Sequence, residues 1–273
     1  MTRFRIRLAY LGTPYCGWQI QRTSESCRPS VQGVVRDMIL KITQESVNIV
    51  ASGRTDAGVH ASGQIAHFSL KKKTWNPKSL FQALNSLLPG SIRVLDLLPV
   101  SAEFDASKAS RKQYSYYLQL GPSELPQWRS RALWIRQELD FEKMKLAASH
   151  FIGTHDFKAY KASGSSAKTS IRTIYDFKIT KMEQSFFNQH MDTNRFYCVC
   201  LSVTGSGFLK QMVRGMVGTL LNVAKGKLLP DDVKNIIAAE DRSMIGTTAP
   251  AHGLWLERVW YEFDNLDEAG LVR

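Results

Sequence analysis

The first ten residues alternate apolar and basic side chains along most of their length. The apolar positions are Phe4, Ile6, Leu8 and Tyr10, and the basic positions are Arg3, Arg5 and Arg7. Successive side chains of a β-strand point to opposite faces, so this period of two predicts a strand with one apolar face and one basic face. A chain that begins in this way packs one side of its first strand against a core and carries positive charge on the other.

Signals for helices and further strands follow along the whole chain. Capping residues and apolar stripes predict five helices. The first starts at 31 and is capped by Ser30, the second is opened by Asn76 with Pro77 and ends at Pro89, and the third is capped by Asp140 and ends at Gly153. The fourth starts at about Phe208 and the fifth at Pro230. Runs of β-branched and aromatic residues predict strands near 92–98, 112–120, 171–182, 195–204 and in the closing segment "GLWLERVWYEF".

These elements predict an α+β fold. Each half of the chain shows a strand, a glycine-containing loop, an amphipathic helix and further strands. We therefore expect two ferredoxin-like, or RRM-like, α+β halves joined across a mixed, mainly antiparallel sheet with a basic cleft at its centre. The expected domains are residues 1–107 and 108–263, with a hairpin connection at 184–194 and a loose tail at 264–273.

The composition indicates a soluble globular protein without structural metal. The chain has 273 residues, of which 44% are apolar, enough for a sizeable core. Its four cysteines form no Cys-x-x-Cys pair and no zinc-like array, which favours reduced thiols in a cytosolic compartment. Neither the first ten residues nor any later apolar run is typical of a secretory signal or a membrane span. We expect a cytoplasmic location and no contact with membranes.

The balance of charge favours a polyanionic partner. There are 36 Lys and Arg against 24 Asp and Glu, a net charge of +12. Such an excess suits contacts with nucleic acid phosphates, although it is also compatible with charge that serves solubility alone. Clusters on several segments, among them Arg111 with Lys112, favour an extended polyanion over a small acidic ligand. The candidate RNA contacts are Arg3, Arg5, Arg7, Gln19, Lys158, Lys161, Lys168 and Arg172.

The segment "ASGRTDAGVHASGQIAHF", residues 51–68, has neither a helical period nor a clean strand period. Gly53 and Gly58 lie on either side of Asp56 and allow backbone angles that other residues avoid, so a tight backbone presents the carboxylate. Asp56 is therefore a candidate catalytic residue. The competing interpretation is a turn aspartate that binds nearby backbone amides.

Within this segment, "GRTDAGVHA" resembles the signature of TruA-type tRNA pseudouridine synthases, in which the aspartate is the catalytic carboxylate. The resemblance continues in order from about Phe4 to Phe263. The further matching motifs are "YLGTPYCGWQIQ", "SVQGVV", "FDASKASRKQYSYYL", "FIGTHDF", "IRTIY", "GFLKQMVRGMVGTLLNVAKGK" and "TAPAHGLWLERVWY". The chain departs from many members at Gly207, where they carry an asparagine, which leaves the contacts of that loop open.

The resemblance implies an isomerase that converts uridine to pseudouridine at positions 38 to 40 of the tRNA anticodon arm, without cofactor or metal. It also implies a homodimer with tRNA lying across both subunits. The reaction breaks the bond from ribose C1′ to uracil N1, turns the base and joins C1′ to C5. A carboxylate serves such a reaction as nucleophile or as stabiliser of a sugar cation. Attack at C1′, attack at uracil C6 and proton loss at C2′ all remain open for Asp56.

Three more residues match the family's site. Arg54 is the candidate to brace the gap left by the extruded uridine through phosphate or base contacts, unless it only orders its own loop. Tyr114, in "RKQYSYYL", corresponds to the family's active-site tyrosine, which would stack on the uracil and assist proton transfer from C5; an ordinary core aromatic is the alternative. Arg214, in "FLKQMVRGMVGTL", would pair with Asp56 and keep it ionised, with a surface arginine as the alternative.

The histidines match no catalytic or metal pattern. His60, His67 and His155 form neither a His-x-x-x-His pair nor a Ser/His/Asp triad, so we expect them to satisfy hydrogen bonds around the cleft. Two other function classes remain compatible with the residues. One is a catalytically inactive RNA-binding or chaperone module with the same basic cleft, and the other is a hydrolase that cuts an N-glycosidic bond with one carboxylate.

Overall fold

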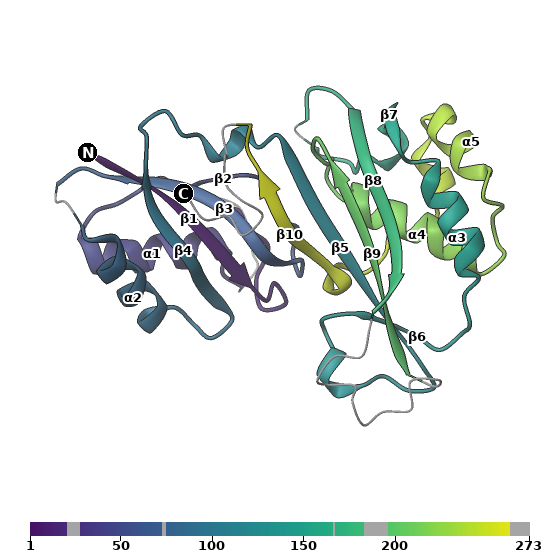
Figure 1. The fold of residues 1–273 in the computed structure, drawn as a ribbon, viewed down its shortest axis with the longest axis horizontal. Coiled ribbons are helices and arrows are strands. Elements are labelled where there is room, and N and C mark those ends of the chain that lie inside the picture. Colours follow the sequence, from purple (N-terminus) through teal and green to yellow (C-terminus); the bar gives the residue numbers. More distant parts are fainter. Residues whose placement is uncertain (21–27, 73–74, 166, 183–195, 263–273) are drawn as a thin grey trace.

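One β-sheet runs through the computed structural model, which describes residues 1–20, 28–72, 75–165, 167–182 and 196–262 (Figure 1). Its strands are β1 (Thr2–Tyr10), β2 (Val50–Ala51), β3 (His60–Leu70), β4 (Ile92–Val100), β5 (Arg111–Leu120), β6 (Leu133–Ile135), β7 (Gly153–Asp156), β8 (Ile171–Lys181), β9 (Tyr197–Gly205) and β10 (Leu254–Trp260). They lie in the order β4-β1-β3-β10-β5-β9-β8-β7, with β2 beside β3 and β6 beside β5.

Most neighbouring strands are antiparallel, and the described exceptions are the pairs β10–β3 and β5–β6. The final strand therefore returns to the middle of the molecule, where it joins the strands of the first half to those of the second. The expected α+β fold with a mixed, mainly antiparallel sheet is confirmed. The expected boundary between residues 107 and 108 falls inside η1 (Ala106–Lys108), and the division into two domains stays a prediction.

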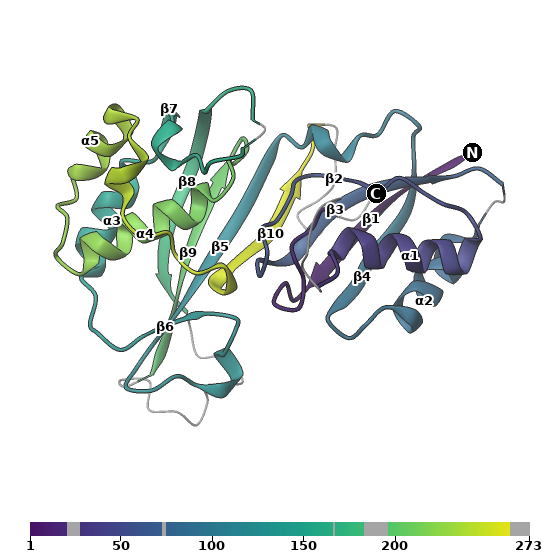
Figure 2. The ribbon, with the colours of Figure 1, turned by 180° about the vertical axis from the view of Figure 1, so that it is seen from behind.

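The helices lie on one face of the sheet, which is the near face in Figure 2. They are α1 (Val31–Thr43), α2 (Pro77–Leu87), α3 (Phe141–Ser149), α4 (Met212–Ala224) and α5 (Asp232–Ala239). α1 and α2 cover the first half of the sheet, and α3, α4 and α5 cover the second (Figures 1 and 2). The expected caps are confirmed, because Ser30, Asn76 and Asp140 each accept a hydrogen bond from an N–H of the first helical turn.

The alternation along β1 has the expected consequence for packing. Phe4, Ile6 and Leu8 have no exposed surface and belong to the same core cluster as Val31 and Val35 of α1. The arginines alternate with them and point to the face that carries no helix. This arrangement gives the first half one dry layer between sheet and helices, and it places the basic side chains of β1 on the opposite side.

The secondary structure differs from the predicted elements at two places. The pattern of residues 51–68 does not indicate a strand, yet residues from His60 onward form β3. This strand lies between β1 and β10 and is buried along nearly its whole length, including polar side chains such as Gln64, so no alternation appears in its sequence. Likewise α4 begins at Met212, after a left-handed Gln211 with φ 61°, and not near Phe208.

Smaller differences occur at helix ends and short strands. α3 ends at Ser149, before Gly153, and the short strands β6 and β7 have no clear sequence signal. The expected hairpin connection at 184–194 and the expected tail at 264–273 lie outside the described residues.

Candidate active site

A cavity of about 580 Å³ lies where loops of the two halves meet on the helix-covered side of the sheet. We call it the Asp56 pocket. The loop after β1 contributes Trp18 and Gln19, the loop between β2 and β3 contributes residues 54–57, and the start of α4 with the loop before it contributes residues 208–214. Ligand pockets in proteins typically measure about 300–1,000 Å³, so this cavity has room for a single nucleoside.

The loop that carries Asp56 is held by the end of β1 and by the loop that follows it. The hydroxyl of Tyr10 lies 2.8 Å from the Thr55 hydroxyl, and the backbone N–H of Trp18 donates to the backbone carbonyl of Thr55. Gly17 has φ +108°, and a Cβ there would lie 2.8 Å from the same carbonyl oxygen. Only a glycine at position 17 therefore lets the loop after β1 pack against the backbone of the Asp56 loop.

His60 joins three segments behind the pocket. Its Nδ1 accepts a hydrogen bond from the Gly12 N–H, and its Nε2 lies 3.0 Å from the carbonyl oxygen of His252. Because a carbonyl oxygen only accepts, Nε2 carries the proton and the ring is neutral. Burial lowers the pKa of His60 from 6.5 to about 4, which agrees with this tautomer. The ring also stacks on Trp255 at 4.3 Å.

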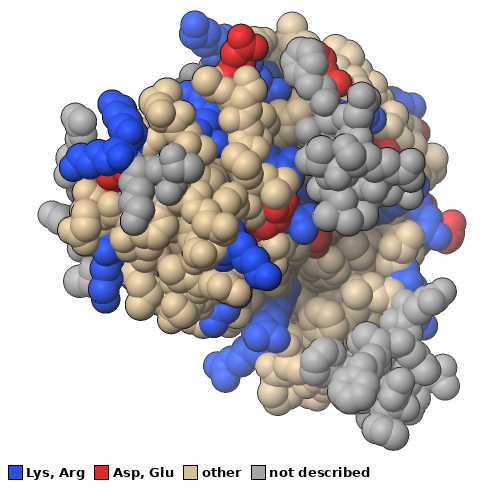
Figure 3. Space-filling view, turned by 60° about the vertical axis from the view of Figure 1, so that its left-hand side comes forward, with Lys and Arg blue, Asp and Glu red and all other residues tan. Residues whose placement is uncertain are grey.

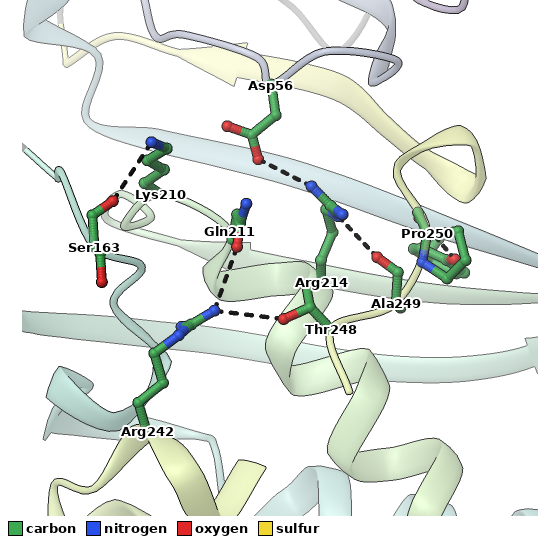
Figure 4. Close-up of polar contacts among 10 residues, drawn as sticks. Asp56, Ser163, Lys210, Gln211, Arg214, Arg242, Thr248, Ala249 and Pro250 are labelled. Atoms are coloured by element: carbon green, nitrogen blue, oxygen red, sulfur yellow. Dashed lines mark hydrogen bonds and ion pairs between the residues drawn. The ribbon is translucent and has the colours of Figure 1, made fainter. Parts of the chain in front are cut away.

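Asp56 and Arg214 form the expected ion pair. Arg214 Nη1 lies 3.4 Å from Asp56 Oδ2, and Arg214 Nε donates to the Ala249 carbonyl at 2.8 Å (Figure 4). The Arg214 side chain is 15% exposed and that of Asp56 is 27% exposed, so the carboxylate is sheltered but reachable from the pocket. α4 packs closely against the segment that contains Thr247 and Ala249. A Cβ at Gly218 of α4 would lie 2.1 Å from the Thr247 carbonyl oxygen, so there is no room for a larger side chain at this position.

Tyr114 lies at the floor of the pocket. It is 7% exposed, and its ring meets that of Phe208 edge-on at 5.2 Å between centroids. Burial, with smaller contributions from Tyr10 and Asp56, raises the pKa of its hydroxyl well above the ordinary value of 10. The side chain therefore stays a neutral phenol at physiological pH, able to donate or accept one hydrogen bond.

Arg54 and Gln19 line the same pocket with exposed side chains. The structure thus brings together five of the residues named from the sequence. They are Gln19, Arg54, Asp56, Tyr114 and Arg214.

The arginines of β1 lie on the opposite face of the sheet from the pocket. Arg5 is 7% exposed and pairs with Asp96 at 2.9 Å, and Arg3 donates to the Phe104 carbonyl. Their expected contacts with RNA stay predictions.

The surface between the two halves carries basic side chains. When the molecule is turned by 60° from the view of Figure 1, Lys and Arg side chains lie along a hollow between the two halves (Figure 3).

The other expected RNA contacts surround the second half. Lys158 forms an ion pair with Glu240 at 3.0 Å, and the Lys161 ammonium donates to the Ala167 carbonyl. Lys168 is exposed. Arg172 donates to the carbonyls of residues 169 and 171. The segment that contains Lys161 also contributes residues 164, 165 and 167 to the pocket wall.

Sequence reasoning missed the positions of several site residues. Lys112, noted only as part of a basic cluster, donates from its ammonium to the Ser52 carbonyl at the base of the Asp56 loop. Burial, with the charge of Arg172, lowers the pKa of Lys112 to about 8. Gln211 and Arg242 meet beside the pocket (Figure 4). Gln211 lies inside the matched motif "FLKQMVR", which is the signal that draws attention to it.

No group of three or more His, Cys, Asp or Glu side chains suited to a metal ion occurs among the described residues. In the same part of the chain, no helix has both the length and the apolar character needed to cross a membrane.

The comparisons with known proteins agree with this geometry. A family model described as tRNA pseudouridine synthase matches residues 7–107 and 147–262. A protein named tRNA pseudouridine synthase A from Maridesulfovibrio salexigens is 39% identical over 264 residues, which cover 96% of this chain and 91% of that protein. Proteins of the same name from Thermoanaerobacter sp. and Acetivibrio thermocellus are 41% and 39% identical, over 96% of this chain and 100% of theirs.

Solved structures add little to the assignment. A crystal structure of the archaeal box H/ACA sRNP Nop10-Cbf5 complex aligns with 80% of this chain and 43% of that chain at 12% identity, and its TM-score is 0.29. The family model, by contrast, matches most of the chain, and the curated relatives cover 96% of it, so the chain belongs to the family of TruA-type tRNA pseudouridine synthases.

Proposed function

We propose that this protein isomerises uridine to pseudouridine in tRNA, at positions 38, 39 or 40 of the anticodon arm. The observation that carries the proposal is the Asp56 carboxylate, held by Arg214 at 3.4 Å in a pocket of about 580 Å³ that has room for one nucleoside. The names of the full-length relatives support tRNA as the substrate. The three positions in the anticodon arm come from the motif resemblance alone.

Asp56 is the catalytic residue in this proposal. The contact with Arg214 directs one carboxylate oxygen, Oδ2, and no other hydrogen bond to this carboxylate occurs within the described residues. The second oxygen is therefore available to the ribose or the base of an extruded uridine. A carboxylate fixed in a sheltered site attacks carbon, or stabilises a sugar cation, with little reorganisation. The routes through C1′, C6 and C2′ all place the carboxylate in this position.

Tyr114 and Arg54 complete the site. The buried ring of Tyr114 offers a flat surface against which a uracil stacks, and its neutral hydroxyl is suited to relay the proton lost from C5. Arg54 is exposed at the edge of the pocket, two residues before Asp56. From there its guanidinium braces the space left when the target nucleotide leaves its stack.

We further propose that the enzyme acts in the cytoplasm as a homodimer that binds one tRNA across both subunits. The net charge of +12 supports an extended contact with phosphates, which reads the shape of the tRNA more than its sequence. Neither a cofactor nor a metal is part of the proposed reaction, since the substrate rearranges without a redox step or a group donor.

The test is incubation of an unmodified tRNA transcript with the pure protein, followed by mapping of pseudouridine to individual positions. We expect conversion at 38, 39 or 40 with no change in RNA mass. Release of free uracil would instead identify a hydrolase of the N-glycosidic bond. Tight tRNA binding without any product would identify an RNA-binding module.

A further inference from the structure

Gln211 occupies an unusual backbone position at the wall of the Asp56 pocket. Its φ of 61° and ψ of 8° lie in the left-handed region, directly before the first residue of α4. This region is unfavourable for residues other than glycine, so neighbouring contacts must hold the glutamine there. Its side chain lines the pocket with Asp56 and Arg214.

Arg242 fixes the orientation of the Gln211 amide. Arg242 Nη2 lies 3.3 Å from Gln211 Oε1 and 3.4 Å from the Thr248 hydroxyl (Figure 4). A guanidinium has only donors, so the amide must turn its oxygen toward Arg242. The amide nitrogen then points the other way, toward the side of the pocket where Asp56 and Lys210 lie (Figure 4).

The charge of Arg242 strengthens this donor. Arg242 has no ion pair among the described residues, and its Nη1 is buried there without a hydrogen-bond partner. A hydrogen bond from an unneutralised guanidinium to Oε1 draws electron density from the amide, which makes its N–H groups better donors. The pocket thus contains an oriented amide donor beside the cations Arg54, Lys210 and Arg214.

An extruded uracil supplies the matching acceptor. Its two carbonyl oxygens, O2 and O4, are neutral acceptors on the edge of a flat ring, whereas the cations suit phosphates or the carboxylate. We propose that the Gln211 amide donates a hydrogen bond to a carbonyl oxygen of the target uracil, and that Arg242 is the positioning residue that aims it. This inference rests on the proposed function, because it assumes that the base in the pocket is a uracil.

The test uses two substitutions of Gln211 and one matched control. Gln211→Glu keeps an acceptor for Arg242 and loses the donor, while Gln211→Met loses both without adding charge next to Asp56. Gln44 provides the control, because it is also a left-handed glutamine, with φ 57°, and lies at the far end of α1 outside the pocket. Gln44→Glu therefore makes the same replacement in the same backbone region.

We expect both Gln211 variants to convert the uridine transcript with kcat/KM lowered by about tenfold or more, the effect of losing one hydrogen bond in a sheltered site. Gln44→Glu is expected to stay within about twofold of the unmodified enzyme, the scatter expected for a surface substitution. Values for Gln211→Met that also stay within that range would overturn the inference. Failure of the unmodified enzyme to make pseudouridine would instead overturn the proposed function.

Binding to a transcript that lacks the target base separates a base contact from a backbone contact. The measurement is made in Asp56→Asn protein, which we expect to form no product. In this background, Gln211→Met is expected to weaken binding of the uridine transcript and to leave binding of the abasic transcript unchanged. Equal weakening of both would place Gln211 on the RNA backbone and overturn the inference. A transcript with cytidine at the target position then distinguishes the oxygens. Relative gain of cytidine binding in Gln211→Glu indicates O4, and no gain indicates O2.

The positioning role of Arg242 has its own readout. Arg242→Lys keeps a cationic donor for the Gln211 oxygen, whereas Arg242→Met leaves the amide free to rotate. We expect kcat/KM to fall in Arg242→Met and to recover in part in Arg242→Lys, with thermal unfolding measured for both. Equal activity of the two variants would contradict a role in aiming Gln211.

Discussion

The buried ring of His60 makes the stability of the fold depend on pH in a defined window. The ring is neutral in the folded protein, with its pKa lowered from 6.5 to about 4 by burial. Above pH 6.5 neither state binds a proton at this position, and the contribution of His60 to stability is complete. As the pH falls from 6.5 toward 4, the unfolded chain takes up a proton that the folded protein does not, so stability falls by about 1.4 kcal/mol per pH unit. The full loss is about 3 kcal/mol.

The assay is urea unfolding at pH 7.0, 5.5 and 4.5, compared between the unmodified protein and His60→Gln. At pH 7 the variant is expected to be less stable by about 1–3 kcal/mol, because the Gly12 N–H loses its acceptor. This deficit should shrink by about 2–3 kcal/mol on going to pH 4.5, since the variant lacks the titrating ring. His155→Gln removes a partly exposed histidine and serves as the control. A deficit that stays constant across the three pH values would refute the reasoning.

Three further perturbations test other parts of the structure. Arg214→Gln is expected to lower the single-turnover rate by about 10- to 100-fold, the value of a charged hydrogen bond of about 1.5–3 kcal/mol; a rate within twofold of the unmodified enzyme would contradict this. Gly17→Ala, at φ +108° and against a backbone oxygen, should lower the free energy of unfolding by about 1–3 kcal/mol, more than Gly226→Ala, which has φ +70° but open space around it. Equal losses would argue against close packing. Lys161 and Lys168 belong to the segment that contributes residues 164, 165 and 167 to the pocket wall, whereas Lys158 is paired with Glu240. In tRNA binding, Lys161→Ala and Lys168→Ala should therefore each lower the slope of log Kd against log salt more than Lys158→Ala does.

The sequence was sufficient for elements that are buried on one side. The first strand, with Phe4 and Ile6 alternating with arginines, and the helix capped by Ser30 both show a period that follows directly from one buried face. β3 shows no such period. It has a neighbouring strand on each edge and both of its faces are buried, so polar residues such as Gln64 are buried together with the apolar ones. An alternation of polar and apolar residues predicts a strand only where one face of the strand is exposed and the other is buried.

Predictions at the site were limited in a similar way. The motif around Asp56 indicated the candidate catalytic loop, and the family resemblance implied Arg214 as the partner of Asp56, a contact that the structure contains. The arrangement of Gln211 beside Arg242 depends on the left-handed backbone of Gln211 and on the short 3-10 helix η5 (Arg242–Ile245), which begins 31 positions further along the chain. No local pattern relates two such residues, so only the fold reveals that they meet.

The most direct test of the account is single-turnover conversion of an unmodified tRNA transcript by the unmodified enzyme and by Asp56→Asn. The two proteins have the same shape at this position, and tRNA affinity, measured in parallel, should agree within about twofold, since the phosphate contacts are unchanged. We expect pseudouridine from the unmodified enzyme and a rate at least about 10⁴-fold lower from the variant, as for the loss of an essential catalytic group. Turnover by Asp56→Asn at a rate near that of the unmodified enzyme would contradict the assignment of the chemistry to this carboxylate.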